Sequence, residues 1–539
     1  MPRLPHGRLN ITPDALRNTR DKVADRTEDV ALGFAMTKPM DTRRFDFLLP
    51  DLQQDDNNLL LESPQTVENL IELGHAMLDP GDDGEGDSEI SAAYTYLGQF
   101  VDHDITLATT SASAQNLLVP NLAPLSVEDI LETTTNIRTA VFELDSVYGN
   151  PARRQPSPNR AKMEIGEVTT LGATAKPQLR PPGKDDFNDL PREPRSPVKE
   201  RDRAARIGDH RNDENTIISQ LHLAFLLAHN KLVDQGNSFR KAKRILRQHY
   251  QHIVLHDFLK QIADPQVVDS TIENGPQVYR PEDHQDEFYM PLEFSVAAYR
   301  FGHSMVRGAY DFNLNFNRSG DPGTLPATLD LLFTFTALSG QLGFGAGART
   351  LPENWIIEWK NFFDAQGGAP RSKARRFDTK LVEPLQRLRD ETGKPLVDSP
   401  TDAGPGRISA SLAVRNLLRG YLLRMPTGQA VANALGEQVL TGDEIKDGAA
   451  SQDQVDALEQ GGFLDRTPLW YYILVESAVR ADGQHLGPVG STIIAEVIVG
   501  LILLSPNSIL RKQDWEPSLG QQQGKFDLPD LLRFAEVLA

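Results

Sequence analysis

Residues 216–236 read TIISQLHLAFLLAHNKLVDQG, and this stretch decides the fold class. Apolar side chains recur in it at three- and four-residue spacing, the period of an amphipathic helix. Gly236 follows the periodic stretch as a typical stop signal. The spacing therefore predicts a long helix whose apolar positions are Ile217, Ile218, Leu221, Ala224, Phe225, Leu227 and Ala228.

The helical period returns along the chain, whereas alternating strand patterns are scarce. We therefore expect a mainly α protein, built as a large single helical domain with long loops and little β structure. One apolar stretch near the C-terminus is hydrophobic on all sides but too short to span a bilayer, which favours a buried core helix. The further predicted helices are 239–262, 292–306, 326–338, 408–423 and that stretch, 489–504.

Composition narrows the classes of function. The 539 residues carry a net charge of -19, which disfavours nucleic acid or an anionic membrane as the main partner and favours a small or neutral substrate. There is no cysteine, so disulfides and a thiolate-ligated haem are excluded. Neither a classical signal peptide nor an apolar run of membrane-spanning length is found. We therefore expect no membrane span, and a protein that is cytoplasmic or exported by a non-classical route.

The chain divides by polarity. Residues 1–60 are charged and polar, and we expect an N-terminal arm packed on a main body that comprises 61–539. Segment 78–89, LDPGDDGEGDSE, lacks the ligand pattern of an EF-hand and is expected to be a solvated loop. Segment 151–205 is rich in proline and charge and is expected to be a long extended excursion.

The segment QFVDHDI, residues 99–105, places a histidine between two aspartates. On a helix Gln99 and His103 share a face, while Asp102 and Asp104 diverge to either side of it. Three neighbours could therefore have three different roles. The alternative is a solvated helix end with scattered polar groups.

Three further segments pair polar residues at three-residue spacing, which places both on one side of a helical turn. Each has an ordinary alternative: an intrahelical ion pair, a core histidine, and a buried asparagine with local partners. A buried asparagine could also orient a histidine ring by accepting its N–H. The pairs are Arg211 and Glu214 in RIGDHRNDEN (206–215), Arg300 and His303 in YRFGHSMVR (299–307), and Asn416 and Arg419 in RNLLRG (415–420).

The segment TAVFELDSVYG, residues 139–149, offers oxygens from Thr139, Glu143 and Asp145 at alternating positions, with the carbonyl of Val141 between them. Such a set suits a hard cation such as calcium. An ordinary acidic turn is the alternative.

Together these segments resemble the animal haem peroxidase family, which contains myeloperoxidase, lactoperoxidase and peroxidasin, and in particular its bacterial members. The motifs occur in family order over about 60% of the chain, which makes chance agreement remote. The resemblance implies a helical haem peroxidase fold, with 61–539 as the catalytic domain. Its motifs are GQFVDHD (98–104), TAVFELDSVYG (139–149), GDHRNDE (208–214), AHN (228–230), YRFGHS (299–304) and RNLLRG (415–420).

The resemblance also implies a role for each residue. His103 is similar to the distal histidine, Arg211 to the distal arginine and Gln99 to the distal glutamine near the halide site. His303 corresponds to the proximal ligand of the haem iron and Asn416 to the residue that holds its ring. The remaining roles are Asp102 and Glu214 as ester links to haem b, Arg300 and Arg419 beside haem and its propionates, and Asp104, Thr139, Val141, Glu143 and Asp145 as calcium ligands.

The implied activity is reduction of hydrogen peroxide and oxidation of a small electron donor, which is a halide, thiocyanate or an aromatic, in a response to oxidative stress. A neutral imidazole such as His103 can move the peroxide proton from one oxygen to the other. A fixed cation such as Arg211 stabilises charge on the departing oxygen. The donor and the oligomeric state stay open.

The sequence departs from the family pattern at three places. Asn215 stands where myeloperoxidase has a methionine bonded to haem, so a third haem bond is not expected. Glu143 stands where the family commonly has aspartate. Cyclooxygenase-like relatives place a radical-forming tyrosine three residues before the proximal histidine, where this chain has Arg300, preceded by Tyr299. A fatty-acid dioxygenase and a non-catalytic haem- and calcium-binding protein remain as alternatives.

Overall fold

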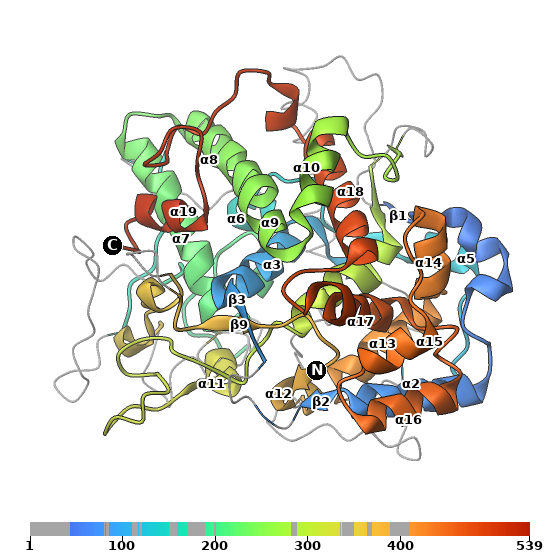
Figure 1. The fold of residues 1–539 in the computed structure, drawn as a ribbon. Coiled ribbons are helices and arrows are strands. Elements are labelled where there is room, and N and C mark those ends of the chain that lie inside the picture. Colours follow the sequence, from blue (N-terminus) through green and yellow to red (C-terminus); the bar gives the residue numbers. More distant parts are fainter. Residues whose placement is uncertain are drawn as a thin grey trace.

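Helices dominate the computed structural model, which confirms the expected mainly α class (Figure 1). Figure 1 shows the helices packed around α3 and α17 at the centre, with short strands between them. Isolated strands cannot bury a face of their own, so the core is made by helix packing. The structure describes residues 44–79, 81, 86–109, 117, 121–149, 159–169, 189–198, 201–281, 288–334, 336, 350–363, 369–388 and 410–539.

The described helices are of three kinds. The α-helices are α2 (Pro64–Ala76), α3 (Ala92–Ile105), α5 (Val127–Thr133), α6 (Asp145–Tyr148), α7 (Thr216–Asp234), α8 (Phe239–Ile253), α9 (Leu259–Ile262), α10 (Pro265–Asn274), α11 (Leu329–Thr334), α12 (Glu383–Gln386), α13 (Leu412–Leu422), α14 (Gly428–Leu435), α15 (Gly442–Asp447), α16 (Gln452–Gly461), α17 (Leu469–Ala481), α18 (Pro488–Leu504) and α19 (Leu528–Phe534). The 3-10 helices are η1 (Pro50–Gln54), η2 (Asp56–Asn58), η3 (His210–Asp213), η7 (Ala298–His303), η8 (Glu353–Trp355), η9 (Trp359–Asn361) and η11 (Ile509–Arg511), and the π-helices are η4 (Val254–Phe258) and η6 (Glu293–Ala297).

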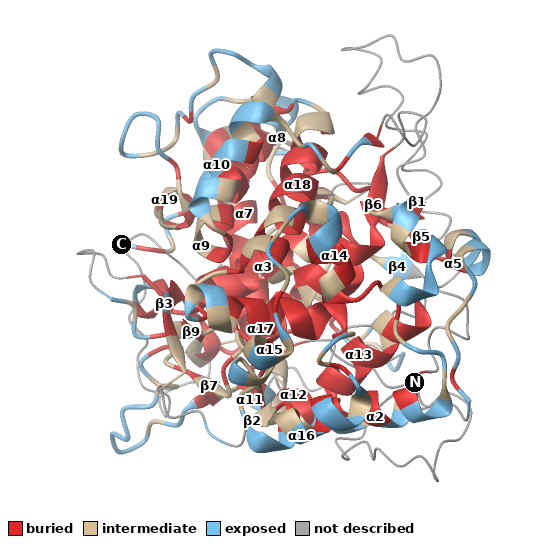
Figure 2. Cartoon of the chain, turned by 45° about the vertical axis from the view of Figure 1, so that its right-hand side comes forward, coloured by how far each residue is buried: buried red, intermediate tan, exposed pale blue. Residues whose placement is uncertain are grey.

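Two helices confirm the sequence prediction directly. The helix expected at 216–236 is α7, which packs between α3 and α8. The apolar stretch 489–504 is α18, which is buried along nearly its whole length and packs against α10 and α17 (Figure 2). Among the described residues, no helix combines the length and apolar character needed to cross a membrane.

The strands of the described residues are short and form four small sheets. The largest has the order β4-β5-β1-β6, in which β1 lies antiparallel to β5 and parallel to β6 with Phe45 opposite Met290. The pairs β10-β2, β3-β9 and β7-β8 complete the set. The bounds are β1 (Arg44–Asp46), β2 (Leu78–Asp79), β3 (Asp87–Ser91), β4 (Ala108–Thr109), β5 (Thr135–Asn136), β6 (Tyr289–Pro291), β7 (Ala309–Tyr310), β8 (Ala327–Thr328), β9 (Lys373–Arg375) and β10 (Leu381–Val382).

The other predicted helices differ from the prediction in length or in helix type. Segment 239–262 is continuous through α8, η4 and α9. Segment 292–306 is helical but not α-helical, because the wide turn of η6 meets the tight turn of η7 at Ala297, whose φ of -121° lies outside the helical range. Of 326–338 the structure describes 326–334 and 336, which contain β8 and the short helix α11. Of 408–423 it describes 410 onward, with α13 inside it.

The expectation of a solvated loop at 78–89 was wrong for its two ends, which lie in β2 and β3. Asp79 pairs with Arg375, and Asp87 pairs with Arg307. Both arginines are buried, and a buried guanidinium requires a carboxylate partner. Within 151–205, the described pieces 159–169 and 189–198 contain only isolated bridges such as Gly166 to Asp189, in keeping with an extended excursion.

The predicted arm of residues 1–60 lies largely outside the described residues, and its described part enters the sheet through β1. Buried Glu293 of η6 holds the chain that follows β1. Its carboxylate accepts hydrogen bonds from the backbone N–H of Leu48 at 2.7 Å and of Leu49 at 3.1 Å. Burial raises the pKa of Glu293 to about 7, although these two N–H groups act in the opposite direction.

We expect Glu293→Gln to reduce the pH dependence of stability. The folded state binds the Glu293 proton more tightly than the unfolded chain, so this contribution is complete below the ordinary pKa and is lost as pH rises through about 7. The free energy of unfolding in urea at pH 5 and pH 8.5 should differ less in the variant, on the order of 1–3 kcal/mol. Glu72→Gln on exposed α2 is the control. An unchanged pH dependence would contradict the prediction.

Candidate active site

Helix α3 carries the histidine between two aspartates. Ser91 caps its N-terminus by accepting the N–H of Ala93. One face is fixed in the core, where Phe100 stacks on Phe225 of α7 with ring centroids 4.6 Å apart. Because that face is buried, Gln99, Asp102 and His103 lie toward the short helix η3 and the start of α7.

The segment GDHRNDEN forms η3 and the cap of α7. Asp209 caps η3 by accepting the N–H of Arg211, and Asn215 caps α7 by accepting the N–H of Ile218. Gly208 is required here, because a Cβ at this position would lie 2.3 Å from the backbone oxygen of Asp145. The turn therefore lies directly against the start of α6.

Polar contacts join α3 to η3 and the start of α7 along their length. Gln99 donates from Nε2 to Glu214 at 2.9 Å, and its oxygen accepts from Asn215 at 3.0 Å. His103 Nδ1 lies 2.8 Å from Asn212 Oδ1. Arg211 Nη1 lies 3.9 Å from Asp102. We call this group the α3–η3 cluster; it comprises Gln99, Asp102, His103, Arg211, Asn212, Glu214 and Asn215.

Arg211 is rigidly held. Its guanidinium contacts both oxygens of Asp209, and Nη2 donates to the backbone oxygens of His103 at 3.1 Å and Thr106 at 2.7 Å. Burial alone would raise the pKa of Asp209, but Arg138 and Arg211 hold it well below its usual range. Asp209 is therefore ionised and fixes the position of the arginine.

The second histidine lies at the end of η7. His303 Nδ1 lies 2.8 Å from the Asn416 amide nitrogen of α13, so the predicted pair is present. The prediction had the amide oxygen accept the ring N–H, whereas here the nitrogen faces the ring; a half-turn of the amide exchanges the two atoms. Trp470 of α17 completes the group, with its ring 6.5 Å from that of His303.

Two cations lie close together in the same region. Arg300 donates from Nε to the Ser295 backbone oxygen at 2.9 Å. Burial and then the charge of Arg300 lower the pKa of Arg419 to about 10. Two adjacent guanidiniums favour an anion that bridges them. We call Arg300, His303, Asn416, Arg419 and Trp470 the η7–α13 cluster.

The two clusters lie on elements that are in contact. The hydroxyl of Tyr299 on η7 donates to the Gly98 backbone oxygen of α3 at 3.2 Å. Trp470 donates to the Arg300 backbone oxygen at 3.2 Å. A small pocket lies beside Asn416, with walls that include Val296, Leu417, Tyr421, Leu469 and Trp470.

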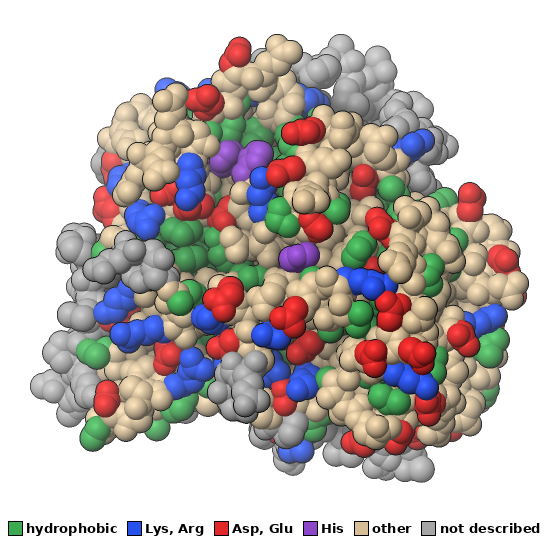
Figure 3. Space-filling view, in the orientation of Figure 1, with side chains coloured by type: hydrophobic (Ala, Val, Ile, Leu, Met, Phe, Trp, Pro, Cys, Tyr) green, Lys and Arg blue, Asp and Glu red, His purple; other side chains and the backbone are tan. Residues whose placement is uncertain are grey.

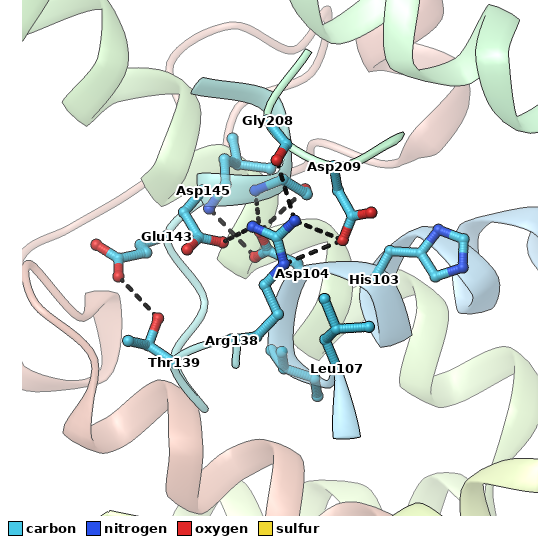
Figure 4. A network of polar contacts seen from close by, with 12 residues as sticks. His103, Asp104, Leu107, Arg138, Thr139, Glu143, Asp145, Gly208 and Asp209 are labelled. Carbon is cyan, nitrogen blue, oxygen red and sulfur yellow. Dashed lines mark hydrogen bonds and ion pairs between the residues drawn. The ribbon is translucent and has the colours of Figure 1, made fainter. Parts of the chain in front are cut away.

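The residues predicted to bind calcium lie together but are already engaged (Figure 4). Both oxygens of Asp104 accept hydrogen bonds, from the backbone N–H of Leu144 and from the N–H and hydroxyl of Ser146. Burial, followed by the charge of Asp145, raises the pKa of Asp104 to about 7. Thr139 donates to Glu143 at 3.3 Å.

Arginines neutralise this acidic group. Figure 4 shows the Arg138 guanidinium between Asp145 and Asp209, with His103 directed away from it. Arg247 of α8 pairs with Glu143 at 3.1 Å. In the part of the chain that the structure describes, no three His, Cys, Asp or Glu residues are arranged to hold a metal ion. The predicted set, including the carbonyl of Val141, therefore does not fit calcium in this arrangement, because internal cations already offset the carboxylates.

The sequence analysis missed residues that support the site. Asp209 could have been found, because it follows the glycine of the GDHR motif and precedes a helix. Asn212 and His222, whose ring nitrogen lies 2.9 Å from the Asn212 amide, gave no separate signal. Arg138 and Arg247 were also missed, since nothing in the local sequence pairs them with the acidic loop.

The fold defines a class of protein. Peroxidase A from Dictyostelium discoideum has a similar structure, with a TM-score of 0.57 and 13% identity over 89% of this chain and 90% of that chain. Fatty acid alpha-dioxygenase from Arabidopsis thaliana is similar with a TM-score of 0.52 and 12% identity, over 84% of this chain and 71% of that one. The fold is that of the helical peroxidases and dioxygenases.

Sequence comparison narrows the class to a family. The family model "Animal haem peroxidase" matches residues 127–336. A "Peroxidase-like protein" of Margaritifera margaritifera is 28% identical over 377 residues, 60% of this chain and 43% of that protein. The "Chorion peroxidase" of Aedes aegypti is 27% identical over 122 residues, 20% of this chain and 15% of that protein.

These matches cover less than half the length of either curated relative. With the shared fold, they confirm the resemblance to the animal haem peroxidase family. The assignment to bacterial members stays a prediction.

We expect stability to be independent of calcium, because Arg138 and Arg247 already neutralise the acidic group. The thermal unfolding midpoints with excess EGTA and with millimolar calcium should agree to within about 1 °C. Metal analysis of the dialysed protein should find no stoichiometric calcium. A calcium-dependent rise of several degrees would restore the predicted calcium site.

Proposed function

We propose that this chain is a haem peroxidase that reduces hydrogen peroxide and oxidises a halide, thiocyanate or an aromatic donor. The observation that carries the proposal is the placement of two histidine-centred clusters on elements in contact, His103 beside Arg211 and His303 beside Asn416. Nearby histidine and arginine side chains provide proton transfer and charge stabilisation, which peroxide cleavage requires. The proposed compartment is the cytoplasm or the exterior, reached by a non-classical route.

The η7–α13 cluster fits haem b. The paired guanidiniums of Arg300 and Arg419 supply the positive charge that two propionates need. The contact between Asn416 and Nδ1 of His303 directs the opposite ring nitrogen, Nε2, away from α13, as expected of an iron ligand. These residues would hold haem, with His303 on the iron.

When bound, haem supplies the iron through which electrons pass from the donor to the peroxide. His103 would take the proton from one peroxide oxygen and return it to the departing oxygen. Arg211 would stabilise the charge that develops there, from a position fixed by Asp209. The peroxide takes up two electrons and two protons and leaves as two water molecules.

Asp102 and Glu214 are the proposed ester links. Both belong to the α3–η3 cluster, where Arg211 and Gln99 orient their carboxylates. Ester formation joins a carboxylate oxygen to a haem methyl carbon with loss of two electrons and one proton, and hydrogen peroxide is the oxidant.

On the face of the molecule in Figure 3, basic and acidic side chains are intermixed among the described residues, which is consistent with a small donor rather than a polyanion.

A fatty-acid dioxygenase is the second candidate, favoured by one observation. The Tyr299 hydroxyl lies 3.2 Å from the Gly98 backbone oxygen of α3, at the junction of the two clusters. Burial and then Asp102 raise its pKa well above the usual range, so the phenol keeps its proton. Oxygen uptake with an unsaturated fatty acid that disappears in Tyr299→Phe would favour this candidate over the peroxidase.

We expect His103→Ala to lower the steady-state oxidation of a dye donor by peroxide about 10²- to 10⁴-fold, the usual contribution of a general acid/base. Haem absorbance should be retained, because His303 would hold the iron. His75→Ala, which removes an exposed histidine of α2, is the matched control. Equal rates in His103→Ala and the unaltered protein would remove the peroxidase proposal.

We also predict that peroxide treatment of the holoprotein makes haem resistant to extraction by acid and organic solvent, because ester bonds form. Mass spectrometry should find haem on peptides that contain Asp102 or Glu214. The double variant Asp102→Ala with Glu214→Ala should release all of its haem. Full extraction from the treated unaltered protein would contradict ester formation.

A further inference from the structure

A buried line of three polar side chains runs from the α3–η3 cluster into α7. Asn212 Oδ1 lies 2.8 Å from His103 Nδ1, and Asn212 Nδ2 lies 2.9 Å from His222 Nδ1. The exposed fractions are 1% for His103, 0% for Asn212 and 0% for His222. The three side chains are buried, and the amide of Asn212 lies between the two histidine rings.

A carboxamide has one accepting end and one donating end, so the two histidines must be in opposite tautomers. With its oxygen toward His103, the Asn212 amide accepts a hydrogen bond from the N–H at Nδ1 of His103, and its nitrogen donates a hydrogen bond to Nδ1 of His222. His103 then carries its lone pair on Nε2, the tautomer that a base acting on peroxide requires. We propose that Asn212 is a positioning residue that fixes this tautomer of His103, with His222 fixing the orientation of the amide; this inference rests on the proposed function.

The support for Asn212 is rigid at both ends. Its backbone N–H donates to the Asp209 oxygen at 3.1 Å inside η3, and Asp209 is itself locked between two arginines. The ring of His222 packs edge-on against Phe100 at 6.1 Å. Burial lowers the pKa of His222 to about 3, so the ring stays neutral across the working pH range and can accept the hydrogen bond of the Asn212 amide at Nδ1.

Other charged groups surround His103 and remain in place in the variants below. Asp102 belongs to its own helix, Asp209 and Arg211 approach from η3, and Arg138 lies behind Asp209. The charges of Asp209 and His103 interact with one another. A change confined to residue 212 therefore isolates the effect of the amide.

The first test measures the tautomer without haem or turnover. Apoprotein labelled with ¹⁵N-histidine distinguishes protonated from unprotonated ring nitrogens, with His103→Gln as the assignment control. We expect the His103 proton on Nδ1 in the unaltered protein and in Asn212→Asp, because a carboxylate can only accept. Asn212→Leu should move the proton to Nε2 or give a mixture. A proton on Nε2 in the unaltered protein, or the same spectrum in Asn212→Leu, would overturn the proposal.

The second test uses cyanide association with the ferric holoprotein, which reports on the base but not on donor oxidation. We expect Asn212→Leu to slow association roughly tenfold to a thousandfold. Asn212→Asp should restore much of the rate and move the acidic limb of the pH profile upward by about one unit or more, because a carboxylate raises the pKa of a neighbouring histidine. A merely structural role would give no such shift, so an unshifted limb in folded Asn212→Asp overturns the proposal.

His222→Leu serves as the second variant if substitution at 212 prevents folding. It leaves the Asn212 oxygen in place but removes the group that orients the amide, so we expect a mixture of His103 tautomers and a smaller loss of cyanide rate than in Asn212→Leu. A spectrum of His222→Leu that shows His103 in a single tautomer would overturn the role of His222. Protein that shows the tautomer but takes up no haem would instead contradict the proposed function and leave this inference intact.

Discussion

The site depends on one buried carboxylate. Asp209 is 2% exposed, and its charge is offset by Arg138 on one side and Arg211 on the other. An ionised group away from water is stable only when donors surround it, so neither arginine can leave without a large cost. Because Arg211 also donates to the carbonyls at the end of α3, the acidic loop, η3 and α3 behave as one unit.

This constraint explains the placement of the groups proposed to be catalytic. Arg211 is held beside Asp102 by contacts that involve its other nitrogens, so its position requires no substrate. His103 is fixed by the neighbouring residue of the same turn, Asn212. The rest of the family-like pattern, Gln99 with Glu214, repeats the same geometry one helical turn earlier. A single short turn therefore orients the whole polar face of α3.

The acidic loop shows how far sequence reasoning extends. Its oxygens were correctly predicted to gather, because alternating donors in a tight turn converge. The arginine partners of the loop were not predicted, since Arg247 reaches Glu143 from 104 residues away and Arg138 turns toward Asp209. Electrostatic partners are chosen by what lies nearby after folding, and no local pattern contains that information. Polar pairs three residues apart could be predicted from the sequence, because the helical period depends only on neighbouring residues.

Local sequence patterns predicted several helices, their buried faces and the order of the motifs, because periodicity and capping act over a few residues. The family resemblance also predicted that two histidines and two arginine-bearing turns belong to one site. Long-range packing sets which groups neutralise one another and which partner a buried histidine ring faces. These pairings form between segments that are distant in the chain. Folding removes water from between the segments, so each buried polar group pairs with the partner that packing brings within hydrogen-bonding distance.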